Sequence, residues 1–117
     1  MSKLEKLKAL RAIAQMVQDA DMARLQKLAS ARNATREKLD ELARPVPLVE
    51  DPALFAARQA HLKWATVQRI QMNQTLAQQT ARVLQQREVT ARSHGRCEAL
   101  GKIDAQERAR LSRKQRP

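Results

Sequence analysis

The sequence is poor in the residues from which compact domains build their cores. Among 117 residues it has one Phe, one Trp, no Tyr and two Gly. Compact cores use aromatic and β-branched side chains, whereas chains dominated by Ala, Leu, Gln and Arg are typical of long helices and coiled coils. We therefore expect one small domain that buries a seam between helices and has modest stability of its own.

Other scarcities limit where the chain works. The single cysteine, Cys97, cannot form an internal disulfide, which fits a reducing compartment, and we interpret it as a small helix residue. No run approaches the roughly 20 apolar residues of a membrane span. The start MSKLEKLKALRAIAQMV is amphipathic and carries lysines, unlike a secretory signal. We expect a cytoplasmic protein that reaches the inner face of a membrane only through a partner.

A first helix is predicted from about residue 3 to residue 43. Ser2 followed by Glu5 fits a capping box at its start. No Gly or Pro then interrupts the chain until RPVPLVEDP, in which three prolines end the helix and predict a turn over 44–51.

Asp51 and Pro52 predict the start of a second helix, with Asp51 as the N-cap and Pro52 at the first helical position. This helix runs to about residue 112. Because a short connection joins two helices, we predict an all-α fold, an antiparallel two-helix coiled-coil hairpin with a longer second helix, over residues 1–117.

Each helix carries an apolar stripe that we expect to form the seam. The stripe of the first helix is interrupted by Asp21 and Arg32. It contains Leu7, Leu10, Ile13, Val17, Leu25, Leu28, Leu39 and Leu42. The stripe of the second helix is weaker and contains Leu54, Ala57, Trp64, Val67, Ile70, Ala77, Ala81, Leu84 and Ala91.

Folding the chain at the turn pairs residue i with about residue 96 − i. Leu4 is then expected near Arg92, and Gln74 and Thr75 face Met22 and Asp21 as a polar layer that fixes the register. The overhang 93–117 would have no partner within the chain. It carries seven basic and three acidic residues and both glycines, so we expect it to fray until a partner orders it.

The charge is strongly positive, +11 with a pI near 11.1, which predicts an acidic partner. Residues 1–52 hold ten basic and eight acidic side chains, and residues 53–117 hold thirteen and four. Basic residues such as Arg58, Lys63 and Arg69 are spread around the second helix, and aromatic residues for base stacking are nearly absent. Nucleic acid would be bound through phosphate contacts alone, and many of these side chains are explained as a solvated basic face.

Catalysis finds no support in the sequence. His61 and His94 are far apart, and a metal site needs three or four convergent ligands. With Gly95 and Gly101 as the two glycines, there is no phosphate-binding loop. A two-helix hairpin also makes a poor pocket for a nucleophile and its base. We expect no enzyme activity, metal or cofactor.

Four large apolar residues near the start of the second helix are candidate partner anchors. They are Leu54, Phe55, Leu62 and Trp64. Leu54 and Trp64 can share the seam, whereas Phe55 and Leu62 point elsewhere. The alternative is ordinary packing near the turn against Leu42, Val46 or Leu48.

The order of a first helix, a turn and a longer basic helix resembles the FliJ family of flagellar type III export proteins and their secretion-system counterparts. The stretch REVTARSHGRCEALGKIDAQERAR (87–110) is similar to that family's arginine-rich C-terminal segment with its E-x-L-x-K core, here Glu98, Leu100 and Lys102. The chain is shorter than is usual for the family, and Gly95 and Gly101 depart from its final helix.

The resemblance implies a non-enzymatic cytoplasmic stalk that contacts the export ATPase ring, the export gate and substrate chaperones. Phe55 and Leu62 match the position of the family's gate-contact patch. The basic C-terminal segment would enter the ring, and the residues expected to contact it are Arg96, Lys102, Arg108 and Arg110. Two alternatives stay open: a basic helical protein that binds nucleic acid, and a helical assembly subunit of another large complex.

Overall fold

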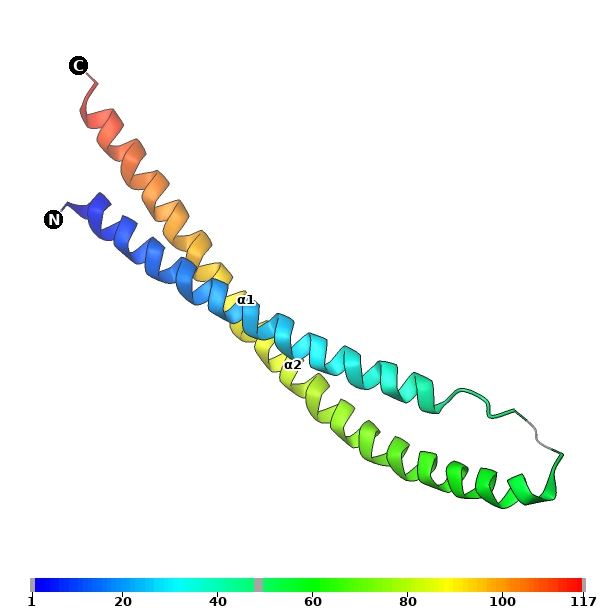
Figure 1. Cartoon of the computed structure of the whole chain (residues 1–117). Helices are drawn as coiled ribbons and strands as arrows, with labels where there is room; N and C mark the ends of the chain where they lie inside the picture. The colour runs from blue at the N-terminus through cyan, green and yellow to red at the C-terminus, as the bar shows by residue number, and fades with distance from the viewer. Residues whose placement is uncertain (1, 48–49, 117) are drawn as a thin grey trace. The chain divides into compact units, whose positions relative to one another are not determined.

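A computed structural model describes residues 2–47 and 50–116 of the chain. It contains two helices, α1 (Lys3–Leu42) and α2 (Pro52–Lys114), and no strand within the described residues (Figure 1). The all-α, two-helix prediction is confirmed, and each helix end lies within about two residues of its predicted position. Leu48, named above as a packing neighbour, lies outside the described residues.

Local sequence explains where each helix begins. The Glu5 backbone N–H donates to Ser2 Oγ at 3.2 Å, and the Ser2 N–H donates to Glu5 Oε2 at 3.4 Å. This reciprocal pair is the predicted capping box, and it satisfies two N–H groups at the helix start. At the start of α2, the Ala53 N–H donates to Asp51 Oδ1 at 3.0 Å, which confirms Asp51 as the N-cap.

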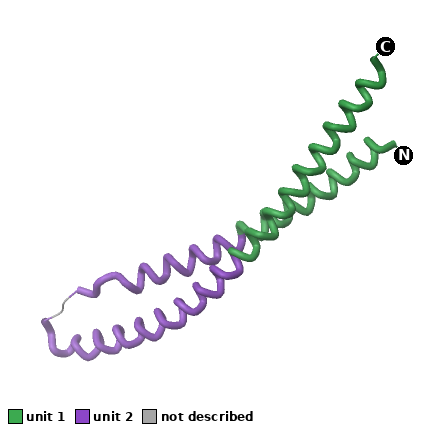
Figure 2. The backbone as a smooth tube through the Cα atoms, turned by 180° about the vertical axis from the view of Figure 1, so that it is seen from behind, with its two compact units in different colours: residues 1–26, 84–117 green, residues 27–83 purple. Residues whose placement is uncertain are grey.

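The chain divides into two compact units, which are coloured separately in Figure 2. Unit 1 comprises Met1–Gln26 and Leu84–Pro117, and unit 2 comprises Lys27–Val83. In unit 1, α1 and α2 are antiparallel, because contacts to α2 move towards its N-terminus as α1 proceeds: Lys3 meets Glu107, and Asp21 meets Gln86. Unit 2 contains the connection between the helices. The fold is thus an antiparallel coiled-coil hairpin with a longer second helix.

The seam of unit 1 is polar mainly on its α2 side. The less exposed positions of α2 are spaced alternately by four and three residues, as a coiled coil requires. They are Gln86, Thr90, Ser93, Cys97, Leu100, Asp104, Glu107 and Leu111, with Gly101 beside them. The corresponding positions of α1 are Leu4, Leu7, Ala14, Gln18, Asp21 and Leu25.

The seam of unit 2 mixes leucines with long polar side chains. On α1 its less exposed positions are Leu28, Ala29, Arg32, Thr35, Leu39 and Leu42. On α2 they are Arg58, Ala65, Gln68, Met72, Leu76, Gln79, Thr80 and Val83. Ala65 and Val83 are its most buried apolar residues. Nε of Arg32, Nε of Arg58 and Oε1 of Gln79 are buried without a hydrogen-bond partner among the described residues.

The predicted stripe of the second helix is wrong, because all nine of its residues are exposed. In the first helix, Leu10, Ile13 and Val17 are also exposed, whereas Asp21 and Arg32, expected to interrupt the stripe, lie in the seam. Alternating three- and four-residue spacing, and not the size of the apolar residues, marks the buried face of α2.

The predicted register is also wrong, and the segment 93–117 is not an unpaired overhang. Arg11 pairs with Asp104 at 3.4 Å and Lys3 with Glu107 at 3.3 Å, so their residue numbers add up to about 110–115 rather than 96. The predicted register assumes that the two helices are in contact directly on either side of the turn. Over residues 51–64, however, Arg58 is the one side chain that is not exposed.

Candidate partner-binding surfaces

The four predicted anchors near the start of α2 all lie on the surface of unit 2. Phe55 is 57% exposed, Leu62 38%, Leu54 48% and Trp64 52%. The expectation that Leu54 and Trp64 share the seam is therefore wrong. Packing of the four against Leu42 or Val46 would have buried them, so their apolar surface faces outward in this unit.

Phe55 and Leu62 lie seven residues apart on α2, which places them on one face of the helix. Leu62 also lines a shallow groove of about 420 Å³ together with Gln59, Lys63, Thr66 and Val67. Trp64 stands beside His61, with ring centroids 5.7 Å apart and the rings tilted by 33°. Exposed apolar groups gathered over a few helical turns are the usual form of a helix-based contact surface.

Of the four basic residues predicted to contact the ring, two form ion pairs within the chain and two do not. Arg108 Nε lies 2.9 Å from Asp104 Oδ2, and Arg110 forms two bonds to Glu107, of 2.6 and 3.1 Å. Arg96 and Lys102 make no ion pair with any described carboxylate. Arg96 and Lys102 are therefore the two of the four whose charge no described carboxylate of unit 1 compensates.

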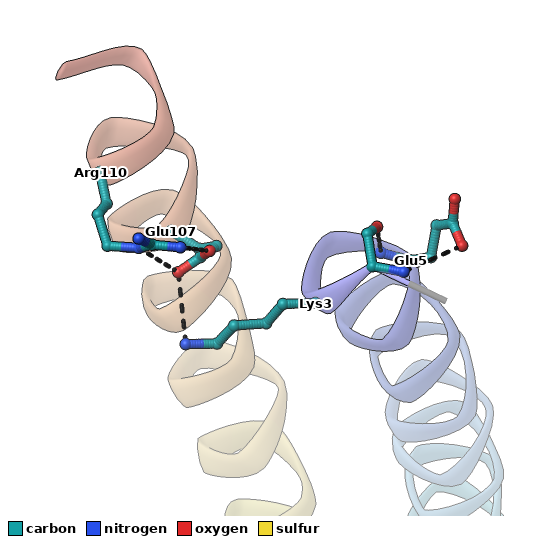
Figure 3. A network of polar contacts seen from close by, with 5 residues as sticks. Lys3, Glu5, Glu107 and Arg110 are labelled. Carbon is teal, nitrogen blue, oxygen red and sulfur yellow. Dashed lines mark hydrogen bonds and ion pairs between the residues drawn. The ribbon is translucent and has the colours of Figure 1, made fainter. Parts of the chain in front are cut away.

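The acids at the end of unit 1 were not predicted as functional residues. Glu107 is 5% exposed and lies between Arg110 on its own helix and Lys3 on α1 (Figure 3). The hydrogen bonds from Arg110, aided by the hydrogen bond from Lys3, lower the pKa of Glu107 from 4.5 to about 2, although burial acts in the opposite direction. The same contact raises the pKa of Arg110. Glu107 therefore stays ionised at neutral pH and links the two helices.

His94 and Glu98 form a further polar contact on unit 1. Gln18 Nε2 lies 2.8 Å from His94 Nδ1, and His94 Nε2 lies 3.2 Å from Glu98 Oε1. Within the E-x-L-x-K stretch, Glu98 thus faces a histidine, Leu100 is half-buried and Lys102 is exposed. His61 belongs to unit 2 and has no part in this contact.

A second groove, about 450 Å³ in volume, lies on unit 1. Its lining residues are Leu10, Ile13, Ala14, Val17, Ser93, Arg96, Ala99 and Leu100. Sequence reasoning assigned Leu10, Ile13 and Val17 to the buried seam and so missed their exposure. The signal that could have found it is the three-four spacing of Leu4, Leu7, Ala14 and Gln18, which leaves these residues to one side.

Two negative findings apply to residues 2–47 and 50–116. Neither helix has a stretch both long and apolar enough to serve as a membrane span. No three His, Cys, Asp or Glu side chains gather there as metal ligands would.

Comparison with models of protein families, with curated proteins and with solved structures found no match to this chain.

Proposed function

We propose that this chain is a non-enzymatic coiled-coil stalk or adaptor of a flagellar-type (type III) protein export ATPase complex. The observation that carries the proposal is the exposure of Phe55 and Leu62 on one face near the start of α2. The FliJ-like pattern of the sequence implies a gate contact at this position. A hairpin whose largest aromatic residues are left off its seam has apolar surface to offer a protein partner.

The basic C-terminal part of α2 supports the second half of the proposal, a contact with the ATPase ring. Arg96 and Lys102 have no carboxylate partner among the described residues, and the net charge of the chain is +11. Acidic groups that line a ring would compensate this charge. Cytoplasmic location, and association with substrate chaperones, belong to the same proposal.

The polar seam is compatible with such a role. A seam of leucines alone would favour tight self-association of several chains, whereas polar residues at seam positions fix one register at some cost in stability. An adaptor that meets several partners benefits from remaining a single hairpin with a defined register.

The direct experiment measures ATP hydrolysis by the cognate export ATPase with and without this protein. We expect stimulation that saturates with added protein and that weakens when Arg96 and Lys102 are both changed to Glu. The matched control changes Arg69 and Arg82, exposed basic residues of unit 2, to Glu, with little effect expected.

Binding to random duplex DNA across a salt series is the companion measurement. Phosphate-only contacts lose affinity steeply as salt rises. Tight DNA binding above about 0.2 M salt, with no effect on the ATPase, would contradict the export proposal in favour of a nucleic-acid-binding protein.

A further inference from the structure

The groove on unit 1 is lined mainly by apolar residues, and three large aliphatic side chains of α1 are exposed in it. Leu10 is 51% exposed, Ile13 59% and Val17 42%, although each is large and aliphatic. Meanwhile Gln18 and Asp21 occupy seam positions against α2. Unit 1 thus leaves Leu10, Ile13 and Val17 uncovered, while two polar residues of α1 face α2.

The spacing of these residues suits another helix. Leu10, Ile13 and Val17 recur at three and four residues, which forms one stripe about two turns long. Across the groove, α2 contributes Leu100 with the small residues Ser93 and Ala99, which permit close approach of a backbone. A third helix laid between α1 and α2 would cover this floor as in a three-helix bundle.

The rim of the groove is basic. Arg96 is part of the lining. Lys6 lies one helical turn before Leu10 and so stands at the N-terminal end of the aliphatic stripe, and Arg92 lies one turn before Arg96 on the same face of α2. Arg24, seven residues after Val17, places a further cation at the other end of the stripe. None of these four cations pairs with a carboxylate in the described part of the chain.

Most acids of unit 1 are engaged in contacts away from this rim. Asp104 and Glu107 form ion pairs in the seam, and Glu98 faces His94. Asp19 accepts a hydrogen bond of 2.9 Å from Gln15, and Glu5 belongs to the capping box. Asp21 lies in the seam, and Glu88 is exposed one turn before Arg92, where it offsets part of the charge. The cations named above still outnumber this single acid, which favours an occupant with negative charge.

We propose that this groove binds an amphipathic α-helix of a partner protein, with apolar residues on one face and Asp or Glu flanking that face. A second copy of this chain would bring the same basic rim, so like charges would oppose it. A nucleic acid could use the cations, but it would leave the aliphatic floor exposed to water. The inference goes beyond the export proposal and does not depend on it, because it concerns unit 1 and not the anchors of unit 2.

The test uses the full chain and three labelled synthetic peptides of about three heptads each. The first has Leu on one face and Glu along its borders, the second has Lys in place of Glu, and the third is a scrambled sequence of the first. Fluorescence anisotropy measures their binding. We expect saturable binding of the acidic peptide, and binding at least about tenfold weaker for the other two.

Variants locate the site. Ile13→Asp should weaken binding of the acidic peptide by about tenfold or more, and Arg96→Glu several-fold with a reduced dependence on salt. Ile70→Asp, at an equally exposed isoleucine of unit 2, serves as the matched control and should leave binding unchanged. Because Ile13 is exposed, circular dichroism should show unchanged helicity in the variant.

Three results would overturn the inference. The acidic peptide would bind no better than the scrambled one, or Ile13→Asp would bind it as the wild type does. Alternatively, sedimentation velocity would show that the chain self-associates and that Ile13→Asp abolishes this, which would make a second copy the occupant. None of these readouts involves the export ATPase, so failure here is distinct from failure of the proposed function.

Discussion

Gln86 Nε2 on α2 donates a hydrogen bond of 3.2 Å to the backbone carbonyl oxygen of Asp21 on α1. The Thr90 hydroxyl lies 3.3 Å from the same oxygen and 2.8 Å from the Gln86 carbonyl oxygen of its own helix, so it can share its single hydrogen between the two acceptors. Gln86 is 7% exposed. A buried polar contact of this kind has a preferred partner position, and it therefore favours one register over its neighbours.

Removal of the Gln86 side chain should destabilise unit 1. Gln86→Ala loses the bond to the Asp21 carbonyl and leaves space in the seam, so we expect the free energy of unfolding to fall by about 1–2 kcal/mol. Urea unfolding followed by circular dichroism measures it. Gln85→Ala, at the exposed neighbouring glutamine, is the matched control, and an equal loss in both variants would show that the contact is not stabilising.

Acid should weaken unit 1 through Glu107. Its pKa lies at about 2 in the folded chain, below the ordinary 4.5, so the folded state binds its proton less readily than the unfolded state. The stability that Glu107 contributes is therefore complete above about pH 4.5 and is lost as the pH falls through about 2.

Glu107→Gln should flatten the pH dependence of stability in this window, whereas Glu88→Gln, at an exposed glutamate, should not. Carbon-detected NMR of the Glu107 carboxyl group gives its pKa directly. A midpoint near 4.5 would contradict the ion pairs with Arg110 and Lys3.

The two glycines of α2 should lower the stability of the helix, and packing does not require a glycine at either position. A Cβ at Gly95 would have no neighbour within 4 Å, and a Cβ at Gly101 would lie 3.8 Å from an Arg11 nitrogen, an ordinary contact. Gly95→Ala and Gly101→Ala should therefore each stabilise the helix by about 1 kcal/mol. Thermal unfolding tests this, with Ala105→Gly as the reverse control. A lower melting temperature for Gly95→Ala would contradict the exposure of this position.

Replacement of an unsatisfied polar side chain in the seam of unit 2 by an apolar one should stabilise this unit. Arg32 lies half-buried between Leu28 and Thr35 in the seam, and its Nε has no partner in the described residues. Arg32→Leu should raise the stability of unit 2 by about 1 kcal/mol or more. Arg36→Leu, on the exposed face, should not. Amide hydrogen exchange in residues 27–83 measures both, and slower exchange in the second variant alone would contradict the prediction.

The ends of the helices could be predicted because their signals are local. Ser2, Glu5 and Asp51 form the caps that their residue types suggest, and the prolines stop α1 after Leu42. Helix type and bounds thus follow from interactions that span only a few residues.

The pairing of the helices could not be predicted in the same way. It depends on contacts between residues such as Asp21 and Gln86, which are 65 positions apart. Polar residues of α2 do lie opposite Asp21, but they are Gln86 and Thr90. The predicted residues, Gln74 and Thr75, are exposed. Many weak contacts along both helices decide which faces meet, and the predicted apolar stripe of α2 stays exposed while a more polar face is buried.

The sequence predicted exposure for only two of the four apolar anchors of unit 2, and the structure leaves all four exposed. Phe55 and Leu62 were expected off the seam and are exposed, whereas Leu54 and Trp64 were expected within it and are exposed too. Because the seam of α2 follows Arg58, Ala65 and Gln68, all four anchors stand outside it. Their role as partner contacts stays a prediction.

The central claim is that Phe55 and Leu62 bind a partner rather than stabilise the hairpin. The measurement is binding of the purified cytoplasmic part of the cognate export gate to wild type, Phe55→Ala, Leu62→Ala and the control Ile70→Ala, together with far-ultraviolet circular dichroism. We predict about tenfold or greater loss of affinity for the first two variants, unchanged affinity for the control and unchanged helicity in all. Loss of helicity in step with loss of binding, or no binding by the wild type, would contradict the claim.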